Sequence, residues 1–142
     1  MEKHELAEIR KHLGKTQKQL AQLLGISLKA IKSFEQGWRN IPNYIERQVL
    51  FLLAANEALN KNNEPCWVIK KCPMTIKKNC PAWELQVGQL CWFINGTICQ
   101  GKVQKDWTAK MKICRKCKVF KSMIPFIGSV APSNESDSCS AG

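Results

Sequence analysis

Residues 16–37 read TQKQLAQLLGISLKAIKSFEQG, and this stretch decides the fold of the first part of the chain. Thr16, followed three residues later by Gln19, is a capping-box pattern that begins a helix. Gly25 supplies a tight turn, because glycine adopts a positive φ at little cost. Ser27 then caps a second helix. Two short helices joined by a glycine-containing turn are typical of a helix-turn-helix.

Helical patterns continue on both sides of this stretch. Before it, the apolar residues Leu6, Ile9 and Leu13 recur at helical spacing. After it, Pro42 fits the first turn of a further helix, which is predicted to run to about Asn60. The first sixty residues are therefore predicted to be helical.

The run of residues 16–21, 24–27 and 31–37 resembles the Cro/repressor-type (XRE) helix-turn-helix family, over about residues 4–60. The resemblance implies an all-α domain of five helices that binds double-stranded operator DNA, often as a homodimer. It also implies a structural salt bridge between a basic residue of the first helix and the Glu that ends the recognition helix. Arg10 and Glu35 match that pair; the alternative is that each is simply solvated.

The recognition helix is predicted at residues 27–36, with its N-terminal part in the major groove. Lys29 and Lys32 would read guanine edges or hold phosphate, unless they form an ordinary exposed face. Trp38 would either contact DNA or pack on the domain's own surface. The residues expected to contact DNA are Gln17, Ser27, Leu28, Lys29, Lys32, Ser33, Trp38, Arg39 and Asn40.

The second half of the chain has a different composition. All eight cysteines and four of the five Trp lie beyond residue 65. We therefore predict a DNA-binding domain at 1–61, a linker at 62–65, a cysteine-rich module at 66–127 and a disordered tail at 128–142. The net charge of +11 gives a basic surface that attracts phosphate backbones.

The role of the cysteines depends on whether the compartment of the protein keeps thiols reduced. The chain begins without a secretory signal, and its longest apolar run, residues 49–55, is too short to cross a bilayer. We expect a cytoplasmic protein with no membrane partner, in which thiols stay reduced. Clustered cysteines then indicate metal ligands or redox sensors before disulfides, and a disulfide-stapled secreted module is the alternative.

Seven cysteines are candidate metal ligands. They exceed the four that one zinc ion or one [4Fe–4S] cluster needs, so some are expected to be buried apolar packers. The cofactor is predicted to be an iron–sulfur cluster, with [4Fe–4S] favoured, or zinc. The candidates are Cys66, Cys72, Cys80, Cys91, Cys99, Cys114 and Cys117.

The module is predicted to contain mostly short strands and loops, with one short helix, around its metal. Residues 67–69, 90–94, 111–113 and 119–120 are extended candidates, and Asn95-Gly96 is typical of a hairpin turn. A module this small often needs a metal for stability. The predicted fold class is therefore α+β: an all-α repressor-like domain followed by a metal-stabilised module.

This half also resembles a known family. The Cys66-Trp67 and Cys91-Trp92 pairs, with Cys114-x-x-Cys117 after them, are similar to the two-CW type cysteine-rich domain over residues 66–121. The resemblance implies that the seven cysteines act as a set.

The predicted function is that of a sequence-specific DNA-binding transcriptional regulator whose metal module either senses redox state or stabilises the assembly. One alternative is an antitoxin-like repressor or protein-interaction adaptor, with a purely structural zinc and a protein partner bound through the C-terminal module. The other is a thiol-redox enzyme using Cys114 and Cys117, but the chain has too few residues there for a thioredoxin-like fold. No enzyme activity is expected.

Overall fold

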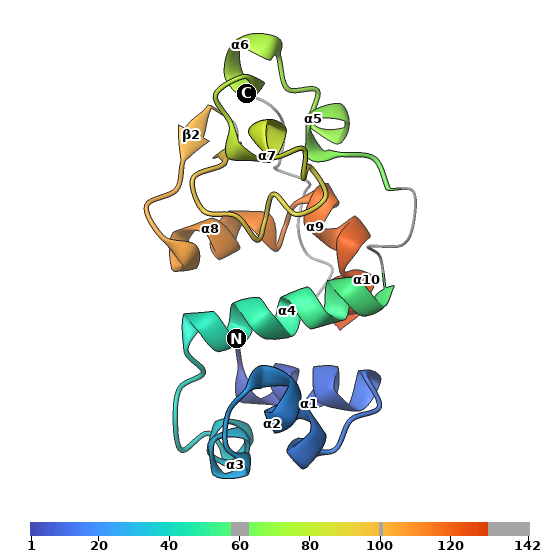
Figure 1. Ribbon diagram of the computed structural model, residues 1–142, viewed down its shortest axis with the longest axis vertical. Helices are drawn as coiled ribbons and strands as arrows, with labels where there is room; N and C mark the ends of the chain where they lie inside the picture. Colours follow the sequence, from blue (N-terminus) through green and yellow to red (C-terminus); the bar gives the residue numbers. More distant parts are fainter. Residues whose placement is uncertain (58–62, 100, 131–142) are drawn as a thin grey trace. The chain divides into compact units, whose positions relative to one another are not determined.

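The computed structural model describes residues 1–57, 63–99 and 101–130. The chain forms two compact units, Met1–Asn56 and Glu57–Gly142 (Figure 1).

The first unit is helical, as expected. Four helices lie in its described residues, where the family resemblance implies five. α3 packs against both α1 and α2, and apolar side chains such as Leu6, Leu20 and Ile31 are fully buried. The helices are α1 (Lys3–His12), α2 (Gln17–Leu24), α3 (Leu28–Gln36) and α4 (Asn43–Glu57). The predicted end of the fourth helix, at about Asn60, lies outside the described residues.

The start of α2 and the turn between α2 and α3 have the predicted capping hydrogen bonds and the predicted glycine conformation. Thr16 Oγ1 accepts a hydrogen bond from the Gln19 backbone N–H at 3.1 Å, and Gln19 Oε1 accepts one from the Thr16 N–H at 3.0 Å. Gly25 ends α2 with a φ of 68°, the left-handed conformation that favours glycine. Ser27 Oγ accepts from the Ala30 N–H at 3.0 Å and caps α3.

The second unit contains short helices and one small hairpin. The helices are α5 (Cys66–Ile69), α6 (Met74–Lys77), α7 (Pro81–Glu84), α8 (Trp107–Cys114), α9 (Lys118–Met123) and α10 (Pro125–Val130). β1 (Ile98–Cys99) and β2 (Lys102–Val103) pair antiparallel, with Ile98 opposite Val103. Its core includes Trp92, whose ring meets that of Phe120 edge-on at 5.5 Å.

The prediction of mostly strands and loops in this unit is wrong. Residues 67–69, 111–113 and 119–120 are helical, and 90–94 lie in turns. Short segments of this kind do not distinguish strands from buried helices. For residues 111–113 the N-cap identifies a helix, because Asp106 Oδ1 accepts from the Ala109 N–H at 2.8 Å at the start of α8.

The predicted hairpin turn at Asn95-Gly96 is wrong as well. A type I′ turn needs a positive φ at both residues, and Gly96 has one (91°) whereas Asn95 does not. The hairpin instead joins β1 to β2.

The predicted start of the tail, at residue 128, is too early. Three of its residues, 128–130, belong to α10, and the remainder, including Cys139, lies outside the described residues. No described helix combines the length and apolar character needed to cross a membrane.

Candidate functional site

Helix α3 presents a basic outer face. Ile31 and Phe34 are buried, whereas Lys29 and Lys32 are exposed and lie three residues apart, on one side of the helix. Leu28 is half-buried, and Ser27 is exposed at the helix start. This half of α3 therefore offers two cations beside a capping hydroxyl.

Ser33 does not belong to that face. The sequence predicts a DNA contact for this residue, but it is only 8% exposed. Because α3 is covered by both α1 and α2, its buried stripe is wide enough to include Ser33 beside Phe34. We therefore exclude Ser33 from the DNA contacts.

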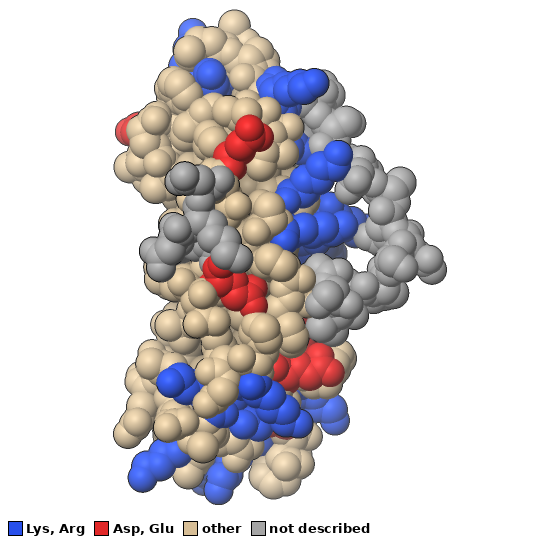
Figure 2. Space-filling model, turned by 90° about the vertical axis from the view of Figure 1, so that its right-hand side faces the viewer, with Lys and Arg blue, Asp and Glu red and all other residues tan. Residues whose placement is uncertain are grey.

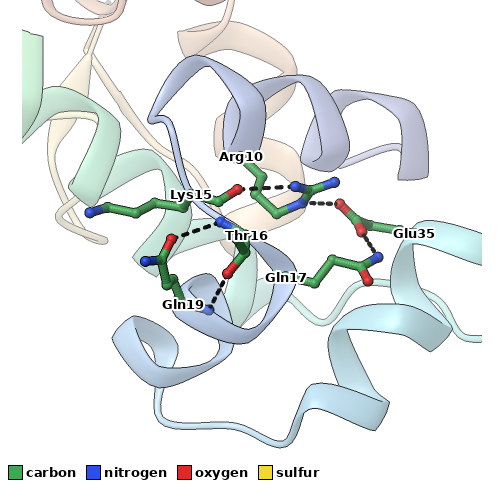
Figure 3. Close-up of polar contacts among 6 residues, drawn as sticks. All are labelled: Arg10, Lys15, Thr16, Gln17, Gln19 and Glu35. Atoms are coloured by element: carbon green, nitrogen blue, oxygen red, sulfur yellow. Dashed lines mark hydrogen bonds and ion pairs between the residues drawn. The ribbon is translucent and has the colours of Figure 1, made fainter.

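A polar network fixes the far end of α3 (Figure 3). Arg10 Nε donates to Glu35 Oε1 at 2.7 Å, which is the ion pair expected from the sequence, and Arg10 also donates to the Lys15 carbonyl at 3.0 Å. The Gln17 amide donates to the other Glu35 oxygen. One carboxylate thus joins α1, α2 and α3. The predicted phosphate contact of Gln17 stays a prediction, and its amide already has this internal partner.

The loop after α3 exposes an aromatic ring. Trp38 is 77% exposed, so the alternative in which it packs on the domain's own surface is wrong. Its backbone N–H donates to the Ser33 carbonyl at 3.0 Å, and the Arg39 guanidinium lies 5.2 Å from the centre of the Phe34 ring. Asn40 is exposed next to them. The loop therefore places a ring, a cation and an amide directly after α3.

Basic side chains are widespread on the surface. Figure 2 shows one face of the molecule, on which exposed Lys and Arg side chains lie on both units. Such a distribution attracts a polyanion without selecting a sequence, so the residues of α3 would have to supply selectivity.

All seven candidate metal ligands line a single cavity in the second unit. Its volume is about 70 Å³, and its other walls include the rings of Trp67, Trp83 and Trp92. All seven thiols are free of disulfides, and Cys80, Cys114 and Cys117 are buried. The structure therefore gathers cysteines that are spread over fifty residues of sequence around one space.

The thiols do not converge on one point. No three His, Cys, Asp or Glu residues in the described ranges are placed so that they could hold a metal ion. One contact would nevertheless stabilise a thiolate, because the Ile98 backbone N–H donates to Cys80 Sγ at 3.3 Å.

Three cavity thiols have shifted pKa values, one lowered and two raised. A hydrogen bond from the Cys91 thiol lowers the pKa of Cys66, and the charge of Lys110 acts in the same direction. The same hydrogen bond, together with burial, raises the pKa of Cys91 well above its ordinary value. Burial also raises the pKa of Cys72. Of Cys66 and Cys91, Cys66 is therefore the thiol that ionises at the lower pH.

Sequence reasoning did not place Lys110 and Thr97 in the cavity wall. Lys110 lines it and is only 4% exposed, and its Nζ donates to the Thr97 hydroxyl at 2.5 Å. Lys110 lies four residues before Cys114, a spacing that places both on one side of a helix. That signal was hidden because residues 111–113 were assigned to a strand.

A family model described as helix-turn-helix matches residues 6–45, from α1 into α4. No curated protein and no solved structure matches the chain significantly. The family match does not reach residues 66–121, so the resemblance to the two-CW type has no support from it. With the geometry of α1–α3, the match shows a helix-turn-helix in residues 6–45 and supports a DNA-binding regulator.

Proposed function

We propose that the chain is a sequence-specific transcriptional regulator that inserts α3 into the major groove of operator DNA. The observation that carries this proposal is the pair of exposed lysines, Lys29 and Lys32, on a helix held by the partly buried ion pair of Glu35 with Arg10. A recognition helix reads DNA by the side chains of its N-terminal part, where these lysines lie.

Neighbouring groups complete the proposed interface. Ser27 and Leu28 lie at the same end of α3, and the exposed Trp38, Arg39 and Asn40 follow its other end. Polar and basic groups beside a recognition helix commonly hold phosphates and fix its register. We propose these roles here, with the chain acting as a homodimer on two half-sites.

In vitro selection from a random duplex library tests this function. We expect one enriched motif made of two related half-sites, about 10 base pairs apart from centre to centre. Lys29→Ala and Lys32→Ala should each lose enrichment, whereas Lys11→Ala, which changes an exposed lysine of α1, should retain it. A library that shows no enrichment with the unaltered protein would exclude sequence-specific binding.

We further propose that the cavity holds an iron–sulfur cluster. The support is the chemistry of the donor set: seven thiols surround one cavity, and soft all-sulfur ligation suits iron–sulfur or zinc. Thiolates on one tetrahedral zinc lie about 3.8 Å apart, given Zn–S bonds of about 2.3 Å. Thiols dispersed around a cavity suit the separated corners of a cluster better than a single ion.

Four cysteines are the proposed ligands. They are Cys80, Cys99, Cys114 and Cys117: the first, third and fourth are buried, and Cys99 adjoins the residue whose N–H contacts Cys80. A bound cluster would supply one-electron redox chemistry, and the remaining thiols would be available for oxidation. Oxidation would then alter DNA binding.

Metal analysis of protein purified without oxygen tests the cofactor. Iron and sulfide in similar amounts, with a broad absorption band near roughly 400 nm, would support the cluster. A colourless protein containing zinc would refute it and favour the adaptor with a structural zinc. Redox sensing is tested separately, because equal DNA affinity of the loaded, oxidised and metal-free forms would exclude it.

A further inference from the structure

Lys110 is a buried cation in the wall of the cysteine cavity. It lies in α8, is 4% exposed, and donates to the hydroxyl of Thr97, which is itself 5% exposed. Burying an ammonium group is unfavourable unless a negative charge compensates it. A neutral hydroxyl satisfies one of its hydrogen bonds but cancels none of its charge.

No carboxylate compensates this charge within the described ranges. Among the described residues, the polar contact of the Lys110 ammonium is the Thr97 hydroxyl. The other titratable groups that line the cavity are the seven cysteines, including Cys114 one turn along the same helix, and two more lysines, Lys70 and Lys77, which are half-buried whereas Lys110 is buried. The compensating charge available to the ammonium is therefore that of thiolates.

We propose that Lys110 is the internal counter-cation of an anionic thiolate-bound centre in this cavity. The inference rests on the proposed cluster. Thiolate ligands outnumber the positive charges of an iron–sulfur core or a zinc ion, so such a centre is anionic. A nearby fixed cation stabilises it, and stabilises the reduced state most, because that state carries one more negative charge.

Two neutral variants, Lys110→Met and Lys110→Gln, test the role, and Lys110→Arg keeps the charge. Lys112→Met is the matched control, because Lys112 is an exposed lysine of the same helix. Each full-length protein is reconstituted with ferrous iron and sulfide, and then titrated with dithionite in the presence of redox mediators. Loss of the cluster to a chelator is followed in parallel.

We expect both neutral variants to have a more negative reduction potential than the unaltered protein and to lose the cluster about tenfold faster or more. Lys110→Arg and Lys112→Met should resemble the unaltered protein. In the metal-free state the neutral variants should melt no lower than the unaltered protein, since they remove an uncompensated buried charge.

The outcomes separate this inference from the proposed function. If the unaltered protein takes up the cluster but the neutral variants keep its potential and its rate of loss, the counter-cation role is wrong and the cluster stands. If both neutral variants melt lower or fail to fold without metal, Lys110 serves packing and the inference is overturned. If the unaltered protein takes up no iron and sulfide, the cluster proposal fails and this role fails with it.

Discussion

Arg10 Nε lies 2.7 Å from Glu35 Oε1, and this ion pair ties α1 to the end of the recognition helix. The Glu35 side chain is only 6% exposed, and its second oxygen accepts from Gln17 on α2. One carboxylate thus orients three helices relative to one another, which sets the angle at which α3 can be presented to DNA.

Replacing Arg10 should destabilise the first unit. Arg10→Met leaves the nearly buried Glu35 carboxylate without its cation, and we expect a loss of about 2 kcal/mol in the free energy of unfolding. Urea denaturation of the full chain, followed by circular dichroism, measures it. Lys11→Met changes the adjacent exposed residue and should cost about 0.5 kcal/mol or less. Equal effects of the two variants would contradict the structural role of the pair.

The second prediction concerns the capping box of Thr16 and Gln19. Thr16→Ala removes the hydroxyl that accepts from the Gln19 N–H, and it should cost about 1 kcal/mol of unfolding free energy. Thr16→Ser retains the oxygen and should stay close to the unaltered protein in the same denaturation experiment. A loss as large for Ser as for Ala would mean that the methyl group, rather than the cap, matters at this position.

The helix-turn-helix was predictable because its determinants are local. Thr16 with Gln19, Gly25 and Ser27 each fix the backbone through a neighbour a few residues away. Ser33 was misplaced because its burial depends on two other helices covering α3, which the spacing within α3 does not reveal.

The second unit was harder to predict because its determinants are not local. A short segment such as Met-Lys-Ile at 111–113 fits a strand or a helix equally well, and the helix is recognised by the Asp106 cap. Cys66 and Cys117 are far apart in the sequence and line the same cavity, a relationship that no sequence spacing encodes. The set of seven cysteines was identified from the sequence, whereas the role of Lys110 emerged only with the fold.

Cys66 should react at lower pH than Cys72. The pKa of Cys66 is lowered by the hydrogen bond from Cys91, whereas burial raises that of Cys72, and both side chains are half-buried. Since the thiolate is the nucleophile, iodoacetamide labelling of metal-free protein should begin at Cys66 as the pH rises. Mass spectrometry of the labelled peptides measures both pH profiles. Cys91→Ala should move the Cys66 profile to higher pH, and labelling of Cys72 ahead of Cys66 would contradict the expectation.

The charges of Lys29 and Lys32 should be visible in the salt dependence of DNA binding. Each phosphate that a protein neutralises adds about 0.9 to the slope of log K against log salt concentration. We expect the double variant Lys29→Ala/Lys32→Ala to have a slope smaller by about 2 if both lysines hold phosphate. The slope is measured by fluorescence anisotropy with a duplex of arbitrary sequence. If they read guanine edges instead, the slope on that duplex should change little, while discrimination between the selected motif and its point variants falls by about 1–3 kcal/mol per lysine. Lys11→Ala serves as the control for a general loss of positive charge. A double variant that keeps both the slope and the discrimination would remove α3 from the DNA interface.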